Sequence, residues 1–196
     1  MRAGVIGLVV VVLVALLFGG CVASGYNGLV RQKAEVDLRW QEVDNQLQRR
    51  NDLIGNLVET VKGAAGQEQQ VFGDIAQARA AMSGASSRTD KIAAAQGMDG
   101  ALSRLLVVVE NYPQLRSMES FTSLMDEVSG TENRISVARG RYNEGVKEYN
   151  VAVRSFPMNL LAGAFQFTPA EGYPVPESSK AVPKVDFGSL RGGGSN

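Results

Sequence analysis

Residues Thr131 to Val153 read TENRISVARGRYNEGVKEYNVAV, and this stretch decides the fold. The pattern Tyr-Asn-x-x-Val begins at Tyr142 and again at Tyr149, seven residues apart. Both copies therefore lie on the same side of one helix. A third copy begins at Tyr26, just after an apolar N-terminus. The stretch predicts a long amphipathic helix and carries no sign of a reaction.

Helical periodicity extends outward from this stretch in both directions. Two sets of apolar residues recur at spacings of three and four, the a/d pattern of helices packed side by side. The first set is Val36, Trp40, Val43, Leu47, Ile54, Leu57 and Val61, with one position missing at Arg50; the second is Phe121, Leu124, Val128, Thr131, Ile135, Ala138, Tyr142, Gly145, Tyr149, Ala152 and Phe156. Two shorter amphipathic runs, near residues 71–82 and 90–112, lie between them.

The predicted fold class is therefore all-α: an antiparallel bundle of about four helices, two of them long, preceded by one N-terminal transmembrane helix. We expect residues 1–25 to be the membrane anchor or a signal segment, residues 26–167 the bundle, and residues 168–196 a flexible tail rich in proline and glycine. The apolar stretch 158–167 either folds back on the bundle or lies on the membrane.

The N-terminus allows three interpretations. Residues 3–30 contain no charge, and the apolar run 5–23 would form about 28 Å of helix, close to the thickness of a bilayer core. The prediction is a retained single-pass helix. The alternative is a lipoprotein signal, because glycines precede the lone Cys21, although Phe18 stands where a lipobox normally has an aliphatic residue. A cleaved secretory signal is the third, with Arg2 as its only charged side chain.

Charges next to the apolar run favour one orientation. Arg31, Lys33 and Arg39 follow the run, whereas Arg2 alone precedes it. By the positive-inside tendency these charges favour a helical domain on the cytoplasmic side of the membrane.

Composition argues against several functions. Twenty basic and twenty acidic residues cancel, so no nucleic-acid partner is predicted. The chain has no histidine, which removes the commonest general base and the Glu-x-x-His pairs of a di-iron bundle. One cysteine excludes a cysteine-cluster zinc site. We expect no catalytic residue, no cofactor and no metal.

Polar residues also recur at helical spacing beside each apolar seam. They are Arg49, Asp52, Asn56 and Glu59 on the first long helix, and Glu132, Arg139, Asn143 and Asn150 on the last. One interpretation is a solvated surface. The other is an interhelical network that fixes helix register, pairing Arg49 or Arg50 with Glu132 and Asp52 with Arg139. Tyr142 and Tyr149 are expected in the core with their hydroxyls at its edge.

Several ordered motifs resemble the LemA family. They are Tyr26-Asn27-x-Leu29-Val30, Trp40, the run from Gln46 to Lys62, Tyr112-Pro113-x-Leu115, Phe121-x-x-Leu124, the run from Thr131 to Asn143, and Phe156-Pro157. The resemblance covers nearly the whole chain to about Phe167. One departure is Gly55, where the family usually has proline; we expect glycine to loosen the first helix here rather than kink it.

The resemblance implies a bacterial membrane protein with one N-terminal helix and a cytoplasmic helical domain of unassigned activity. It also suggests organisation of membranes or partners rather than catalysis. Our leading hypothesis is a membrane-anchored scaffold or adaptor that binds protein partners or associates with itself. The alternative is an envelope lipoprotein, anchored through Cys21, that binds a ligand or surface partner.

Overall fold

All the regular structure in the described part of the chain is α-helical, which confirms the predicted fold class. The computed structural model describes residues 2–63 and 68–174, and no strand occurs in these ranges. Six helices follow one another: α1 (Arg2–Lys62), α2 (Gln69–Gly84), α3 (Arg88–Glu110), α4 (Pro113–Arg116), α5 (Glu119–Arg154) and α6 (Met158–Ala164). Four of them form the bundle, and α4 and α6 are short additions.

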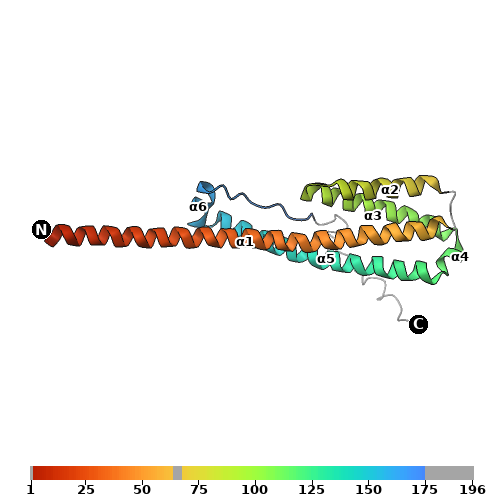
Figure 1. The fold of residues 1–196 in the computed structure, drawn as a ribbon, viewed down its shortest axis with the longest axis horizontal. Helices are drawn as coiled ribbons and strands as arrows, with labels where there is room; N and C mark the ends of the chain where they lie inside the picture. The colour runs from red at the N-terminus through yellow and green to blue at the C-terminus, as the bar shows by residue number, and fades with distance from the viewer. Residues whose placement is uncertain (1, 64–67, 175–196) are drawn as a thin grey trace, which may run out of the picture.

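The apolar N-terminus and the first bundle helix are one continuous helix. α1 has 61 residues, or about 90 Å at 1.5 Å per residue. The sequence predicted an anchor and a separate bundle helix from residue 27, but the stretch that joins them contains no proline, and the helix continues through it. In Figure 1 the red N-terminal part projects alone from the bundle. The bundle is therefore attached to the apolar segment without a flexible linker.

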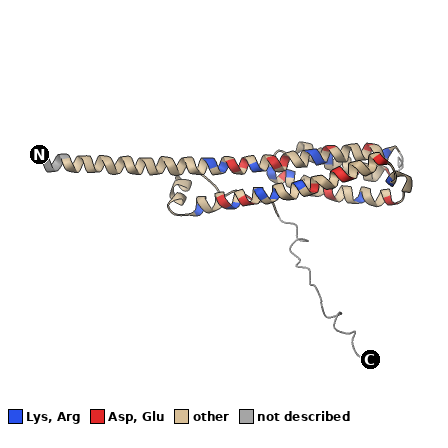
Figure 2. Ribbon diagram, turned by 90° about the horizontal axis from the view of Figure 1, so that it is seen from below, with Lys and Arg blue, Asp and Glu red and all other residues tan. Residues whose placement is uncertain are grey.

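Only the free end of α1 has the properties of an exposed membrane segment. Its most apolar window has a mean hydropathy of 2.9, and none of that window is buried within the protein. After Arg2, the next charged residue of α1 is Arg31, where the bundle begins (Figure 2). α3 is also long and apolar enough to cross a membrane, with a hydropathy of 1.4, but 39% of its window is buried against its neighbours. The burial identifies α3 as a core helix of the bundle.

The two long helices, α1 and α5, lie side by side, and α2 and α3 pack on each other and on α1 (Figure 1). All seven apolar residues of the first predicted seam are buried. Most of the second seam is buried as well, including Thr131 and Gly145. Phe156 is an exception: α5 ends at Arg154, and the Phe156 ring is 81% exposed beyond that end. The last position of the predicted seam, Phe156, therefore lies outside the helix and does not belong to the core.

Gly55 makes room for an arginine rather than loosening α1. The helix runs through this position without a break. A Cβ placed there would come within 2.6 Å of Cζ of Arg79, whose side chain reaches across from α2. The missing side chain lets this guanidinium lie directly on the α1 backbone.

The chain after α5 folds back on the bundle. α6 packs against α1, and the following residues run extended along the bundle towards its middle (Figure 1). This includes Thr168–Pro174, which the sequence assigned to a flexible tail; Tyr173 is only 5% exposed. The rest of the predicted tail, residues 175–196, lies outside the described residues.

Candidate functional site

The two tyrosines of the repeat hold the returning chain. Tyr142 and Tyr149 are each 1% exposed, on the side of α5 that faces the core. The Tyr142 hydroxyl donates a hydrogen bond to the carbonyl of Glu171 at 2.7 Å, and the Tyr149 hydroxyl donates one to the carbonyl of Thr168 at 3.1 Å. Each ring is thus part of the core while its hydroxyl binds the main chain of the segment outside it.

The two asparagines of the repeat bind the same segment through paired hydrogen bonds. Asn150 accepts from the Ala170 amide at 2.7 Å and donates to the Ala170 carbonyl at 2.9 Å. Asn143 accepts from the Tyr173 amide at 2.7 Å and donates to the Tyr173 carbonyl at 3.0 Å. A carboxamide carries one acceptor and two donors on one plane, so it can pair with a main chain as a neighbouring strand would. We call Tyr142, Asn143, Tyr149 and Asn150 the clamp.

The seven-residue spacing of the clamp matches the length of extended chain that it binds. Seven residues of helix rise about 10.5 Å. Three residues of extended chain, from Ala170 to Tyr173, span about 10 Å. Two asparagines separated by two helical turns therefore meet every third residue of an extended segment without strain. This agreement explains the Tyr-Asn repeat better than helix packing alone.

One side chain anchors the segment in a pocket. The Tyr173 ring stacks near Trp40, with 6.5 Å between centroids, and the Arg139 guanidinium lies over it at 4.4 Å. Burial raises the pKa of the Tyr173 phenol, and the positive charge of Arg139 offsets only part of that rise. Gly172 allows the close approach, since a Cβ there would lie 3.1 Å from Oδ1 of Asn143. Recognition of the segment is otherwise mainly through its backbone.

A charged cluster lies beneath this anchor. Arg50, the missing position of the first seam, is 9% exposed and makes an ion pair with Glu132 at 2.5 Å and with Asp99 at 2.9 Å. The structure thus brings together one pair that the polar stripes predicted. Asp99, from α3, did not emerge from the sequence, because no periodic pattern marks it. Burial raises the pKa of Asp99, and this effect exceeds the opposite effect of Arg50.

The other predicted network residues lie elsewhere. Arg49 is 3.4 Å from Glu127 rather than Glu132. Asp52 and Asn56 are exposed, and no ion pair joins Asp52 to Arg139 among the described residues. Asp52 follows Arg50 by two residues, about 200° around the helix, so it points away from the cluster. Arg139 instead covers Tyr173.

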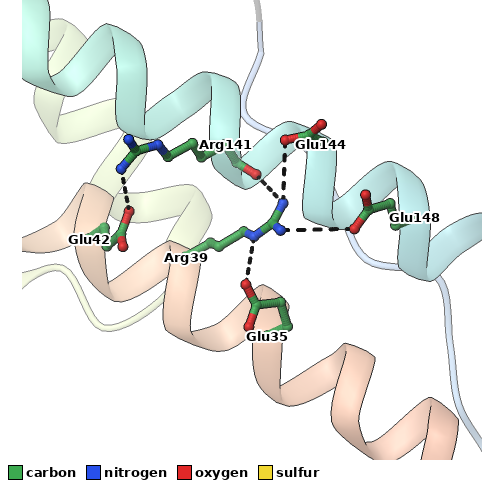
Figure 3. A network of polar contacts seen from close by, with 6 residues as sticks. All are labelled: Glu35, Arg39, Glu42, Arg141, Glu144 and Glu148. Carbon is green, nitrogen blue, oxygen red and sulfur yellow. Dashed lines mark hydrogen bonds and ion pairs between the residues drawn. The ribbon is translucent and has the colours of Figure 1, made fainter.

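A second arginine cluster joins α1 to α5 at the clamp (Figure 3). Arg39 donates to the carbonyl of Arg141 at 3.0 Å and to the carboxylate of Glu35 at 2.9 Å, with Glu144 at 3.7 Å and Glu148 at 3.9 Å. These carboxylates, Glu35 first, raise the pKa of Arg39. A Cβ at Gly145 would come within 2.9 Å of Arg39 Cδ, so this glycine lets the side chain cross the helix. In the sequence Arg39 stood out only as a positive charge after the apolar run, and no periodic pattern marked it as a contact between the two long helices.

The polar contacts between elements of the described chain join helices to one another or hold the returning chain. Within residues 2–63 and 68–174 no group of three Cys, Asp or Glu side chains is placed to hold a metal ion. Cys21 is free and exposed on α1, where it lines an apolar groove with Met158 and Leu161. The clamp is the one arrangement in this part of the chain that already binds an extended peptide.

The family model described as LemA family matches residues 39–187, about three quarters of the chain. Relatives include magnetosome proteins MamQ 1 and MamQ 2 of Paramagnetospirillum magneticum, each 26% identical to this chain, with the match covering 84% of this chain and 70% of the relative. Magnetosome protein MamQ of Magnetospirillum gryphiswaldense is 25% identical, with 70% and 60% covered. The region that the family model matches includes the clamp, the Arg50 cluster, Arg39 with its α5 partners, and the returning segment.

Proposed function

The chain belongs to the LemA family, and from its structure we propose that it is a single-pass, membrane-anchored scaffold that binds protein partners on the cytoplasmic side of a bacterial inner membrane. Its membrane association is supported by the apolar end of α1 and by the magnetosome relatives. The continuous α1 carries the bundle at a fixed height from the apolar segment, as a scaffold requires. The positive charges after residue 30 support the cytoplasmic orientation. We assign no catalytic activity.

The observation that carries the proposal is the paired hydrogen bonding of Asn143 and Asn150 to an extended segment. Recognition of this kind resembles the addition of a strand to a sheet edge, in which main-chain bonds give affinity and a few side chains give selectivity. The same geometry fits any extended segment that pairs one residue with Asn150, as Ala170 does, and carries an aromatic side chain three residues later, as Tyr173 does. Partner proteins therefore bind by placing such a segment on the clamp in exchange for residues 168–173.

Photochemical crosslinking in membranes tests this function. A photoreactive amino acid replaces Lys147, which is exposed on α5 between Asn143 and Asn150 in the helical sequence. The full-length chain then carries either no further change, Tyr173→Ala, or Tyr173→Ala with Asn143→Ala and Asn150→Ala. Tyr173→Ala weakens the internal segment while leaving both asparagines intact, so partner crosslinks rise several-fold.

The triple variant returns partner crosslinks to the level of the unchanged chain, because the released face no longer pairs with a main chain. Equal yields from all three chains would exclude partner binding at the clamp. A product of twice the chain's mass would show that a second copy is the partner, which is the self-association form of the same proposal. The matched control replaces Asn133, exposed on the same helix, with alanine.

Two measurements separate this proposal from the lipoprotein alternative. If α1 is the anchor, the intact mass of the purified protein corresponds to a chain that still contains residues 1–20 and carries no diacylglyceryl group. A mature chain that begins at a lipidated Cys21 would overturn the spanning helix. Protease digestion of spheroplasts leaves the bundle intact if it is cytoplasmic and degrades it if it faces outward.

A further inference from the structure

α6 is apolar apart from the exposed Asn159, on its outer face as well as on the face that packs against α1. Its inward residues, Met158, Leu161 and Ala162, pack on α1. On the outside and at its ends, Leu160 is 64% exposed, Phe156 81% and Phe165 50%. No charged residue occurs from Ser155 to Ala170. A helix with apolar residues on its outer as well as its inner face needs an apolar environment on both, and the bundle covers only the inner one.

α6 lies beside the end of the apolar segment of α1. Met158 and Leu161 close on Gly25, where a Cβ would come within 2.7 Å of Leu161. The distance along α1 from Ile6 to Gly25 is about 28 Å, close to the thickness of a bilayer hydrocarbon core. α6 thus joins α1 where the apolar segment reaches the membrane surface. The groove between the two helices is lined by Phe18 and Val22 of that segment as well as by Leu160.

Aromatic residues gather at the same level. Tyr26 meets Phe165 edge to face at 4.9 Å and Phe167 at 5.7 Å. Aromatic rings are enriched at the boundary between lipid and water, where one side of the ring is apolar and the other hydrated. The first basic residues, Arg31 and Lys33, follow within two turns of α1, at the height of lipid headgroups.

We infer that α6 and its flanking phenylalanines form an interfacial foot: they insert into the headgroup boundary of the bilayer beside α1, giving the bundle a second contact with lipid. This inference rests on the proposed spanning role of α1. The occupant is the bilayer itself, because the exposed rings continue the apolar surface of the membrane segment. A foot fixed on one side of α1 restrains rotation and tilt of the bundle, which a single helix does not.

Fluorescence in reconstituted vesicles tests the foot. The full-length chain, with Cys21→Ala, receives one cysteine at Leu160, labelled with an environment-sensitive dye, in phosphatidylcholine and phosphatidylglycerol vesicles. Control chains carry the cysteine at Val107, which is 63% exposed near the end of α3 that leads to α4, or at Leu17 within the apolar run. Lipids with a nitroxide near the headgroup quench the dye at position 160 at least several-fold more than the dye at position 107.

Each outcome decides between the two proposals. Quenching at position 160 no greater than at position 107, with strong quenching by deeper nitroxides at position 17, would overturn the foot and leave the spanning helix in place. Weak quenching at all three positions would overturn the spanning helix. A fourth chain with the label at Phe156, outside α6, guards against unfolding of that short helix by the dye.

Discussion

Replacing Asn150 with alanine provides the most direct measure of the clamp. The change removes both hydrogen bonds to Ala170 and leaves the α5 backbone intact. A typical hydrogen bond contributes about 0.5–1.5 kcal/mol net of competing water, so two of them stabilise the docked segment by about 1–3 kcal/mol. Asn150 is partly buried, and its loss opens no core cavity. The cost therefore falls on docking of the segment rather than on folding of the bundle.

Hydrogen exchange of the Ala170 amide reports this cost. In the unchanged chain this amide donates to Asn150 and exchanges only when the segment opens. A loss of about 1–3 kcal/mol lowers its protection by about 5- to 150-fold, since 1.4 kcal/mol is a factor of ten. Peptide fragments covering residues 165–174, analysed by mass spectrometry, give the rates. Pro169 and Pro174 have no amide hydrogen, so eight amides contribute to the signal, and overlapping fragments isolate the contribution of Ala170.

The control is Asn133→Ala on the same helix, whose side chain makes no hydrogen bond to a described residue. It leaves the protection of Ala170 unchanged. A change of less than about twofold in Asn150→Ala, or an equal loss in the control, would show that the paired bonds do not hold the segment. Protection of Tyr173, which pairs with Asn143, tells whether the segment opens as one unit.

Three further predictions concern the surroundings of the clamp. Gly140→Ala raises the free energy of unfolding by about 0.5–1 kcal/mol, because alanine favours the helix and nothing lies within 4 Å of the new Cβ. Gly145→Ala gives no such gain, because the Arg39 side chain packed on this glycine must move. Thermal unfolding followed by circular dichroism compares the two variants. A double-mutant cycle of Arg50→Met and Glu132→Gln, measured by urea unfolding, gives a coupling free energy of about 1–2 kcal/mol. This value is lower than for a fully buried ion pair, because the Glu132 carboxylate is half exposed to water. A coupling below about 0.5 kcal/mol would contradict the prediction. The Tyr173 phenol is neutral in the fold and has a raised pKa, so its contribution to stability is intact below pH about 10 and is lost as pH rises through the folded pKa. Burial raises the pKa of Tyr149 as well, so absorbance at 295 nm shows late-ionising phenols, of which Tyr173→Phe removes one.

The sequence predicted the bundle well because burial imposes a period that side chains must follow. All seven residues of the first seam are buried, and Arg50, the interruption, is buried with them. That position was informative: a long polar side chain on a core face needs partners, and Glu132 on the other stripe was within reach. Asp99 was not predictable, because the position of α3 relative to α1 depends on the packing of the whole bundle.

The clamp was only half visible in the sequence. The repeat of Tyr142 and Tyr149 placed both residues on one face of α5. Its partner is a main chain, however, and binding through main-chain atoms requires no particular residue types in the bound segment, so the sequence of that segment gives no sign of it. Residues 168–174 contain two prolines and a glycine and were therefore assigned to a flexible tail. Proline and glycine are equally compatible with an extended segment whose hydrogen bonds are made by asparagines. The clue in the sequence was the spacing of the two asparagines, because seven residues of helix have about the same length as three residues of extended chain.

Position, more than sequence, would decide which partner segments reach the clamp. Bonds to main-chain atoms discriminate weakly among sequences, and only the ring pocket at Tyr173 adds selectivity. Trp40, which meets Tyr142 edge to face at 5.3 Å, lies fifteen residues beyond Gly25 on the continuous α1. Fifteen residues of helix rise about 22 Å, so a bundle standing on the bilayer places the clamp within about 25 Å of the lipid surface. A segment tethered to the same membrane reaches that height at a high effective concentration, whereas a free segment must displace residues 168–173 from solution. The rigid helix would thus supply the selectivity that backbone recognition lacks, by restricting partners to those on the same side of the same membrane.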